Sequence, residues 1–109
     1  MNKQLKFAPA LVPLVLSGEK TSTWRLWDDK DLSVGDIVDF IAFDTKAQFA
    51  QGKLTEVIEK PLGELTQEDK KGHEQFANDD EMYKTYTSYY GRPVDKGTKV
   101  KLIWFTLVN

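Results

Sequence analysis

Apolar and polar residues alternate along the chain in short runs, which predicts several strands with a few helices between them. Residues 5–7 have the spacing of a first strand, and residues 11–17 predict a short apolar helix that Gly18 ends. Residues 21–27 are rich in β-branched and aromatic side chains, which favours a strand. The first quarter of the chain therefore predicts a strand, a helix and a second strand.

The middle of the chain is dominated by further strands. A turn at residues 33–36 leads into an apolar run at residues 37–43, which has the length of a strand. Residues 48–58 predict a second strand pair, which Pro61 ends. Gly52 in this segment indicates either a β-bulge or a close backbone approach.

Helices are predicted in the second half of the chain. Thr66 followed by Asp69 resembles an N-terminal cap, so a short helix is expected at residues 67–71. Asn78 resembles the cap of a longer helix at residues 79–90, because an acidic residue follows it at capping-box spacing. A glycine and a proline after the last turn indicate where this helix ends.

Residues 99–108 predict the final strand, and their apolar second half indicates a position inside the sheet. Together the segments amount to five or six short, mostly antiparallel strands with two or three inserted helices. This order predicts an α+β fold whose sheet curls into a small β-barrel. Periodicity alone is equally compatible with an open sheet.

Length and composition place the chain among ordinary globular proteins. With 109 residues it can bury one core, so residues 1–109 are expected to form a single domain. Hydrophobic residues make up 40% and charged residues 29%, which argues against disorder and against a membrane protein. The longest apolar stretch, residues 8–16, resembles neither a membrane span nor a signal peptide, so we expect a cytoplasmic protein.

Charge and metal-binding residues narrow the functional classes further. The chain has no cysteine and a single histidine, His73, so no metal site and no cofactor are expected. The formal net charge of -2 argues against a general nucleic-acid-binding protein, because such proteins neutralise phosphates with lysine and arginine. We therefore expect a protein that acts on a small molecule; we also expect it to be a monomer.

Residues 18–25 contain the pattern G-x-K-x-x-x-x-R, formed by Gly18, Lys20 and Arg25 directly after the predicted apolar helix. This pattern resembles the signature of the ASCH family, whose fold is a PUA-like β-barrel. Three further features occur in the expected order: the helix end Leu16-Ser17-Gly18, the turn Val34-Gly35-Asp36, and the segment Gly72-His73-Glu74-Gln75-Phe76 before a tyrosine-rich helix. The resemblance covers nearly the whole chain.

The resemblance to the ASCH family also implies an activity. One group of small stand-alone members hydrolyses the amide of N4-acetylcytidine with a lysine, a threonine and a glutamate. The lysine and the threonine correspond to Lys20 and Thr23. Glu74 is the nearest match to the glutamate, although the local spacing departs from that of the group and Phe76 is an alternative alignment partner.

Amide hydrolysis requires a nucleophile, a base and a group that stabilises the oxyanion. In one arrangement Lys20 is the neutral base, Thr23 attacks or orients water, and Glu74 protonates the leaving amine. In the other, Lys20 stays charged and stabilises the oxyanion while Glu74 activates water. Lys20 and Glu74 exchange roles between the two arrangements, and both remain open.

The strand register predicts which side chains face the ligand. Residues three apart on a regular strand point to opposite faces, so Lys20 is expected in the bend before the strand. Thr23 and Arg25 are expected to line the pocket, whereas Trp24 packs in the core. Tyr90 and Arg92, at the end of the long helix, are further candidates for substrate binding, because an aromatic ring beside an arginine suits an unstacked base.

Several of these residues also have an ordinary structural interpretation. Lys20 is compatible with a solvated turn, and Arg25 is compatible with an ion pair to Asp36 or Asp39. His73 is expected to cap a helix or to satisfy a buried hydrogen bond rather than to act in catalysis. These interpretations place the same residues in different surroundings, so a structure separates them.

The tyrosines at positions 83, 86 and 90 have the spacing of a core-facing helical stripe, which we favour over a stacking platform for bases. A stacking platform would fit an alternative function, that of a noncatalytic RNA-binding module. A ribonuclease is a third alternative, but the sequence offers neither a histidine pair nor a metal site for it.

Overall fold

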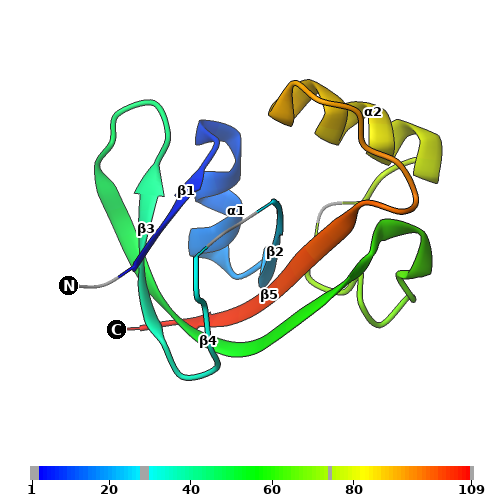
Figure 1. The fold of residues 1–109 in the computed structure, drawn as a ribbon. Coiled ribbons are helices and arrows are strands. Elements are labelled where there is room, and N and C mark those ends of the chain that lie inside the picture. Colours follow the sequence, from blue (N-terminus) through cyan, green and yellow to red (C-terminus); the bar gives the residue numbers. More distant parts are fainter. Residues whose placement is uncertain (1–2, 28–29, 74, 109) are drawn as a thin grey trace.

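The structure is a computed structural model of the chain, and it describes residues 3–27, 30–73 and 75–108. The described residues form five strands, two α-helices and two short 3-10 helices (Figure 1). In chain order these are β1 (Lys3–Phe7), η1 (Pro9–Leu11), α1 (Val12–Ser17), β2 (Ser22–Leu26), β3 (Ile37–Ala42), β4 (Gln48–Pro61), η2 (Leu62–Glu64), α2 (Asp79–Tyr90) and β5 (Lys99–Leu107).

The five strands form one sheet in the order β1-β3-β4-β5-β2. β1 runs parallel to β3, and the other neighbours are antiparallel. The long strands β4 and β5 bend together, so the sheet curls into a half-barrel (Figure 1). The predicted α+β class is confirmed, as is the interior position of β5. β1 and β2 form the two edges of this mixed sheet.

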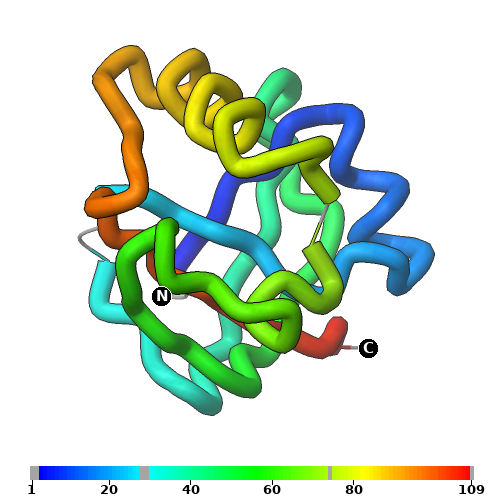
Figure 2. The backbone as a smooth tube through the Cα atoms, turned by 90° about the vertical axis from the view of Figure 1, so that its right-hand side faces the viewer, coloured from blue at the N-terminus to red at the C-terminus, as the bar shows by residue number. Residues whose placement is uncertain are grey.

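Two hydrophobic clusters lie on the sheet. The first contains Phe7, Phe40 and Phe105, and the ring of Phe40 lies 4.9 Å from that of Phe7 and 4.8 Å from that of Phe105. A Cβ atom on Gly52 would lie 2.3 Å from the Phe40 ring, so the neighbour that requires glycine here is a side chain. The second cluster packs α2 against β2 and β5, and both Figure 1 and Figure 2 place α2 over β2.

A glycine ends each α-helix, and a side-chain cap begins α2. The side chain of Asn78 accepts a hydrogen bond from the Glu81 N–H at 2.8 Å, and Gly91 ends α2 with a φ of 67°. Gly18 ends α1 in the same left-handed conformation, with a φ of 85°. Glycine adopts this conformation with little strain, so the chain turns sharply after each helix. The boundaries predicted for the longer helix are confirmed.

Two predicted elements are wrong. Residues 67–71 form turns instead of a short helix. The cap-like bonds between Thr66 and Asp69 do form, but the Asp69 carboxylate is also bound by Lys60 at 2.6 Å, which ties the turn to β4. Residues 48–58 belong to the single long strand β4, whose bulge after Leu54 lets it bend without ending.

No helix among the described residues combines the length and the apolar character that crossing a membrane requires.

Candidate active site

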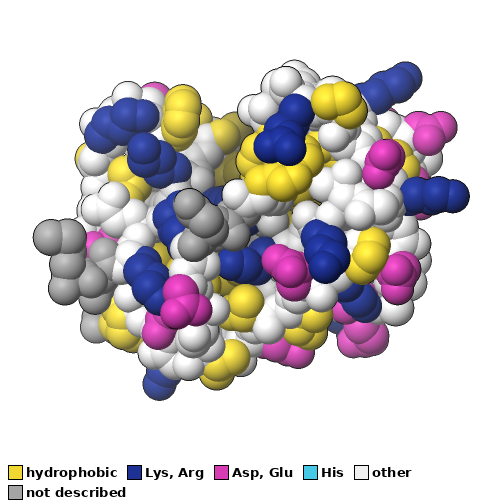
Figure 3. Space-filling model, viewed as in Figure 1, with side chains coloured by type: hydrophobic (Ala, Val, Ile, Leu, Met, Phe, Trp, Pro, Cys, Tyr) yellow, Lys and Arg dark blue, Asp and Glu magenta, His cyan; other side chains and the backbone are white. Residues whose placement is uncertain are grey.

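A cavity of about 530 Å³ opens over β2, between the end of α2 and the segment that joins β1 to α1. In Figure 3 the surface is hollowed between the part built from α1 and β1 and the part built from α2. The described residues that line it are Lys6, Phe7, Ala8, Leu11, Lys20, Thr23, Trp24, Arg25, Phe43, His73, Tyr86, Ser88, Tyr89 and Tyr90. Its walls are therefore largely aromatic, with a few cationic side chains.

Lys20 lies in the bend between α1 and β2 and lines the cavity. Its backbone N–H donates to the Leu14 carbonyl at 3.0 Å, which fixes the bend that Gly18 begins. Only 3% of Lys20 is exposed, so the interpretation as a solvated turn lysine is wrong. The predicted position before the strand is confirmed.

Thr23 and Arg25 are neighbours on β2, and both line the cavity. Thr23 is buried, and its Oγ1 accepts a hydrogen bond from Arg25 Nη1 at 2.6 Å. Arg25 also donates to the Trp24 carbonyl at 3.0 Å and, through Nη2, to the Lys6 carbonyl at 2.7 Å. Because β1 and β2 are the two edges of the sheet, the bond to Lys6 links those edges.

The two aspartates considered as partners of Arg25 make other contacts. Asp36 forms an ion pair with Lys3 at 3.3 Å. The backbone N–H of Ser33 and the Lys3 ammonium together hold the pKa of the Asp36 carboxyl below its usual value. Asp39 accepts a hydrogen bond from Gln51 Nε2 at 2.9 Å.

His73 lies in the wall of the cavity because the segment before it docks on β2. The Gly72 carbonyl accepts hydrogen bonds from the N–H groups of Thr21 at 2.9 Å and Ser22 at 3.1 Å. The buried His73 ring stacks on Trp24 at 3.8 Å, and its Nε2 lies 3.3 Å from the Tyr86 hydroxyl. The expectation of a buried, hydrogen-bonded histidine is confirmed.

Glu74, the predicted third catalytic residue, lies outside the described residues. The residues before and after it line two different hollows. His73 belongs to the large cavity, and Gln75 belongs to a smaller pocket on α2. The role of Glu74 therefore stays a prediction.

Tyr90 lines the cavity near the end of α2, and its hydroxyl accepts a hydrogen bond from the Leu26 N–H at 3.1 Å. Arg92 is not among the described lining residues, and its guanidinium lies 3.9 Å from the centre of the Trp27 ring. Tyr86 is buried, and Tyr83 and Tyr90 pack against the same cluster, so the tyrosine stripe faces the core as expected.

No protein-family model matches the chain, and no curated protein sequence matches it either. Solved structures do match. A protein of Enterococcus faecalis from the DUF984 family is 18% identical with a TM-score of 0.78, and the match covers 99% of this chain and 80% of that one. The ASCH domain of Lactobacillus crispatus is 14% identical with a TM-score of 0.68, over 90% of this chain and 70% of that one.

A mutant of the ASCH protein of Zymomonas mobilis is 12% identical with a TM-score of 0.70, over 97% of this chain and 72% of that one. The chain has the fold of ASCH domains. The fold expected from the resemblance at residues 18–25 is therefore confirmed.

The ASCH fold brings residues into the cavity that the sequence pattern did not indicate. Phe7 and Lys6 come from β1, and Phe43 follows β3. Their proximity depends on the parallel pairing of β1 with β3 and on a bond from the Phe43 N–H to the Phe7 carbonyl at 2.8 Å. No local motif marks such long-range contacts.

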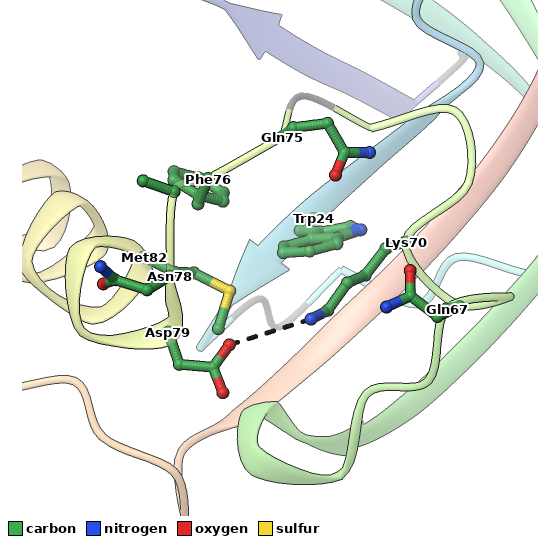
Figure 4. A pocket seen from close by; sticks show the side chains of 9 residues that line it. Trp24, Gln67, Lys70, Gln75, Phe76, Asn78, Asp79 and Met82 are labelled. Atoms are coloured by element: carbon green, nitrogen blue, oxygen red, sulfur yellow. Dashed lines mark ion pairs between the residues drawn. The ribbon is translucent and has the colours of Figure 1, made fainter.

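The chain also forms a pocket of about 190 Å³ on the other side of Trp24 (Figure 4). An ion pair between Lys70 and Asp79, 3.8 Å apart, crosses this pocket. The Nε1 edge of Trp24 faces Gln75 and Lys70 in Figure 4, and no described residue accepts a hydrogen bond from this buried atom. Trp24 is thus a wall shared by the pocket and the larger cavity.

Groups of three or more side chains suited to holding a metal ion do not occur within residues 3–27, 30–73 and 75–108.

Proposed function

We propose that the chain is a member of the ASCH family and that its large cavity hydrolyses N4-acetylcytidine to cytidine and acetate. The observation that carries this proposal is Lys20, a lysine with only 3% exposure that lines a ligand-sized cavity together with Thr23. Lysines are almost never fully buried unless they are paired or functional, because removing an ammonium group from water is costly.

The shape and lining of the cavity support a nucleoside ligand. A volume of about 530 Å³ lies within the range of small-molecule sites. Trp24, Tyr86 and Tyr90 provide aromatic surface on the side of α2, which suits a planar pyrimidine. The ribose would then lie toward β1, which contributes Lys6 to the lining.

The proposed reaction adds water across the acetyl amide. The bond between the carbonyl carbon and N4 breaks, the carbon takes the hydroxyl group of water, and N4 takes a proton. Arg25 bonds to Thr23 Oγ1 at 2.6 Å, and a cationic donor at this oxygen stabilises negative charge on it. This contact supports Thr23 as the nucleophile, with Lys20 as the base that takes its proton and Glu74 as the acid that protonates N4. The acetyl group then passes to Thr23 Oγ1 as cytidine leaves, and water breaks that ester, which releases acetate and returns a proton to Thr23.

A steady-state assay of cytidine release tests this proposal. We expect wild-type protein to turn over N4-acetylcytidine, and we expect Lys20→Met and Thr23→Val to lower the rate about 100-fold or more. Lys53→Met is the matched control, because Lys53 is exposed on β4 and does not line the cavity. Circular dichroism shows whether each variant is folded. An inactive wild type, or a folded Lys20→Met variant with full activity, would refute the proposal.

A second candidate function is noncatalytic binding of single-stranded RNA, and exposed rings near the cavity favour it. Phe43 is 57% exposed and Tyr89 is 70% exposed, and both line the cavity. Lys46 lies 4.0 Å from the Phe43 ring centre, and aromatic rings beside cations suit unstacked bases. If this function is correct, affinity for a short single-stranded RNA falls steeply with salt, and N4-acetylcytidine is not hydrolysed.

A further inference from the structure

The buried indole nitrogen of Trp24 is a hydrogen-bond donor without an acceptor. Only 2% of Trp24 is exposed, and its Nε1 has no hydrogen-bond partner among the described residues. Most buried polar groups are hydrogen-bonded, because an N–H group that leaves water without gaining an acceptor is destabilising. The ring is held in this position by its stacking on His73, with 3.8 Å between the ring centres. A ligand with an acceptor atom at Nε1 therefore completes a bond that the fold leaves unmade.

The smaller pocket, of about 190 Å³, lies beside this nitrogen, between the turns at residues 67–71 and the start of α2 (Figure 4). Gln67 and Gln75 contribute side-chain amides to its wall, and both lie on the side of the indole that carries Nε1 in Figure 4. Gln75 is exposed, and exposed side chains change rotamer rapidly. Its side chain can therefore give way to a ligand at Nε1.

The charges of this pocket favour a neutral ligand. Among its described lining residues only Lys70 and Asp79 are charged, and their formal charges cancel. Lys70 Nζ lies 3.8 Å from Asp79 Oδ1, which is longer than a hydrogen bond, so both groups keep the capacity to bond to a ligand. Lys70 attracts an anion at Nε1, but Asp79 repels it. The pocket therefore suits a ligand that has acceptor and donor atoms and no net charge.

The size and the apolar wall of the pocket favour a small planar ligand. Phe76 and the buried Met82 line it beside the indole, and the ring centres of Trp24 and Phe76 are 6.4 Å apart. A volume of about 190 Å³ is below the range of sites for drug-sized ligands. An amide group fits these limits, because it is planar and neutral. Its carbonyl oxygen accepts from an indole N–H, and its own N–H donates to a carboxylate or to a glutamine oxygen.

We propose that this pocket is a second binding site and that its ligand is a small neutral amide whose carbonyl oxygen accepts a hydrogen bond from Trp24 Nε1. The same group occurs in open-chain amides and, as a cyclic amide, in the ring of uracil. The inference does not rest on the proposed hydrolysis, because the large cavity lies on the other side of Trp24.

Nuclear magnetic resonance of the indole N–H groups tests this site without any catalytic assay. The chain has three tryptophans, and single substitutions by phenylalanine assign their indole signals. Acetamide is expected to shift the Trp24 indole proton downfield and to saturate with a Kd of about 1–10 mM, which is typical of so small a ligand. Acetate has the same shape but a negative charge, so we expect it to bind about fivefold more weakly or not at all.

Uracil is the third probe and identifies the source of the amide. If uracil shifts the Trp24 indole proton and binds more tightly than acetamide, the ligand is a nucleobase. If acetamide binds more tightly, the ligand is an open-chain amide. A Trp24 signal that neither acetamide nor uracil shifts in a saturable way overturns the inference. Acetate that binds as tightly as acetamide overturns the assignment of a neutral ligand.

Removing the indole donor makes the test specific. Trp24→Phe keeps an aromatic ring but has no N–H group, so we expect acetamide to bind about tenfold more weakly, as followed by the backbone amide signals of residues 76–79. Trp27→Phe is the matched control and is expected to keep the wild-type Kd, because Trp27 is exposed and is not among the described lining residues. An unchanged Kd in Trp24→Phe overturns the role of Nε1.

A variant of Gln75 separates ligand binding from an internal hydrogen bond. Gln75 is exposed, so Gln75→Ala is expected to fold. In the ligand-free protein this substitution is expected to leave the chemical shift of the Trp24 indole proton unchanged. An upfield shift in Gln75→Ala shows that the Gln75 side chain accepts from Nε1 in solution, and it overturns the inference.

Discussion

At the scale of single residues, β2 and the bend before it carry the reactive candidates and a structural link. Thr23 and Lys20 line the cavity, and Arg25 connects Thr23 to the opposite edge of the sheet through the Lys6 carbonyl. Arg25 therefore has two functions at once. It holds the threonine hydroxyl in place, and it holds together the two sheet edges between which the cavity opens.

Substituting Arg25 with lysine tests this link. Arg25→Lys keeps the charge, but its single ammonium nitrogen cannot occupy the positions of both Nη1 and Nη2, which bond to Thr23, Trp24 and Lys6. We therefore expect the free energy of unfolding to fall by about 1–3 kcal/mol. Urea denaturation measures the change. Arg92→Lys is the matched control, because Arg92 is exposed and its contact with Trp27 predicts a loss below about 1 kcal/mol. Equal losses in the two variants would contradict the bridging role of Arg25.

The sequence identified the candidate residues on β2 more fully than it identified their surroundings. Strand register placed Thr23 and Arg25 in the cavity wall, because side-chain alternation is a local property. Trp24 was expected only in the core, yet this buried ring also lines two hollows. A large side chain has more than one surface, and strand alternation predicts only its direction.

At the scale of elements, the segment before α2 is held against β2 by backbone contacts. The Gly72 carbonyl accepts from Thr21 and Ser22, and the Lys71 carbonyl accepts from Ser22 Oγ at 3.3 Å and from Trp104 Nε1 at 3.3 Å. These bonds position His73 on Trp24. The geometry of the cavity wall therefore depends on close packing at Gly72.

Adding a methyl group at Gly72 tests this packing. A Cβ atom there would lie 2.0 Å from Thr21 Oγ1, and the φ of +79° is unfavourable for alanine. Gly91→Ala is the matched control, because Gly91 has a φ of +67° and open space around its Cβ position. We expect thermal denaturation to show that the free energy of unfolding falls by about 1–2 kcal/mol in Gly91→Ala and by more in Gly72→Ala. A Gly72→Ala variant as stable as Gly91→Ala would argue against close packing of Gly72 on the start of β2.

Asp69 lies in the turns at residues 67–71 and makes the free energy of unfolding dependent on pH. Partial burial raises the pKa of Asp69, but hydrogen bonds from Lys60 and from Thr66 outweigh it, so the pKa lies below its usual value. A carboxyl group with a lowered pKa in the folded state contributes stability above its unfolded pKa of about 3.9. That contribution is lost as the pH falls through the folded pKa.

The lowered pKa of Asp69 predicts how a substitution there changes stability at each pH. Asp69→Asn is expected to be less stable than wild type at neutral pH, and the difference is expected to shrink as the pH falls below about 4. Urea denaturation across this range measures it. Asp44→Asn, at an exposed turn position, is expected to show little difference at any pH. A difference between Asp69→Asn and wild type that grows toward low pH would contradict the prediction.

The helices show how far local signals determine an element. Asn78 and Gly91 cap α2 with their own side chain and backbone, so the prediction from sequence was correct. Thr66 and Asp69 made the same cap-like bonds, but residues 67–71 form turns. A helix that short gains little from its own hydrogen bonds, and contacts with β2 and β4 determine the conformation instead.

At the scale of the whole molecule, the cavity is a product of long-range pairing. Lys6 and Phe43 reach it because β1 pairs with β3, whereas Lys20 and Tyr90 reach it from the opposite side. The pattern of apolar residues predicted the fold class but not this meeting of segments. Shape and charge of the site appear only when both edges of the half-barrel are in place.

We propose that this cavity hydrolyses an acetylated cytidine through Lys20 and Thr23. Product analysis by mass spectrometry, in water labelled with heavy oxygen, tests it most directly. We predict that N4-acetylcytidine yields unlabelled cytidine and acetate that carries one heavy oxygen atom, and that folded Lys20→Met and Thr23→Val variants yield almost none. Intact substrate after incubation with wild-type protein would contradict the proposed hydrolysis. Acetate release by those variants at the wild-type rate would contradict the roles of Lys20 and Thr23.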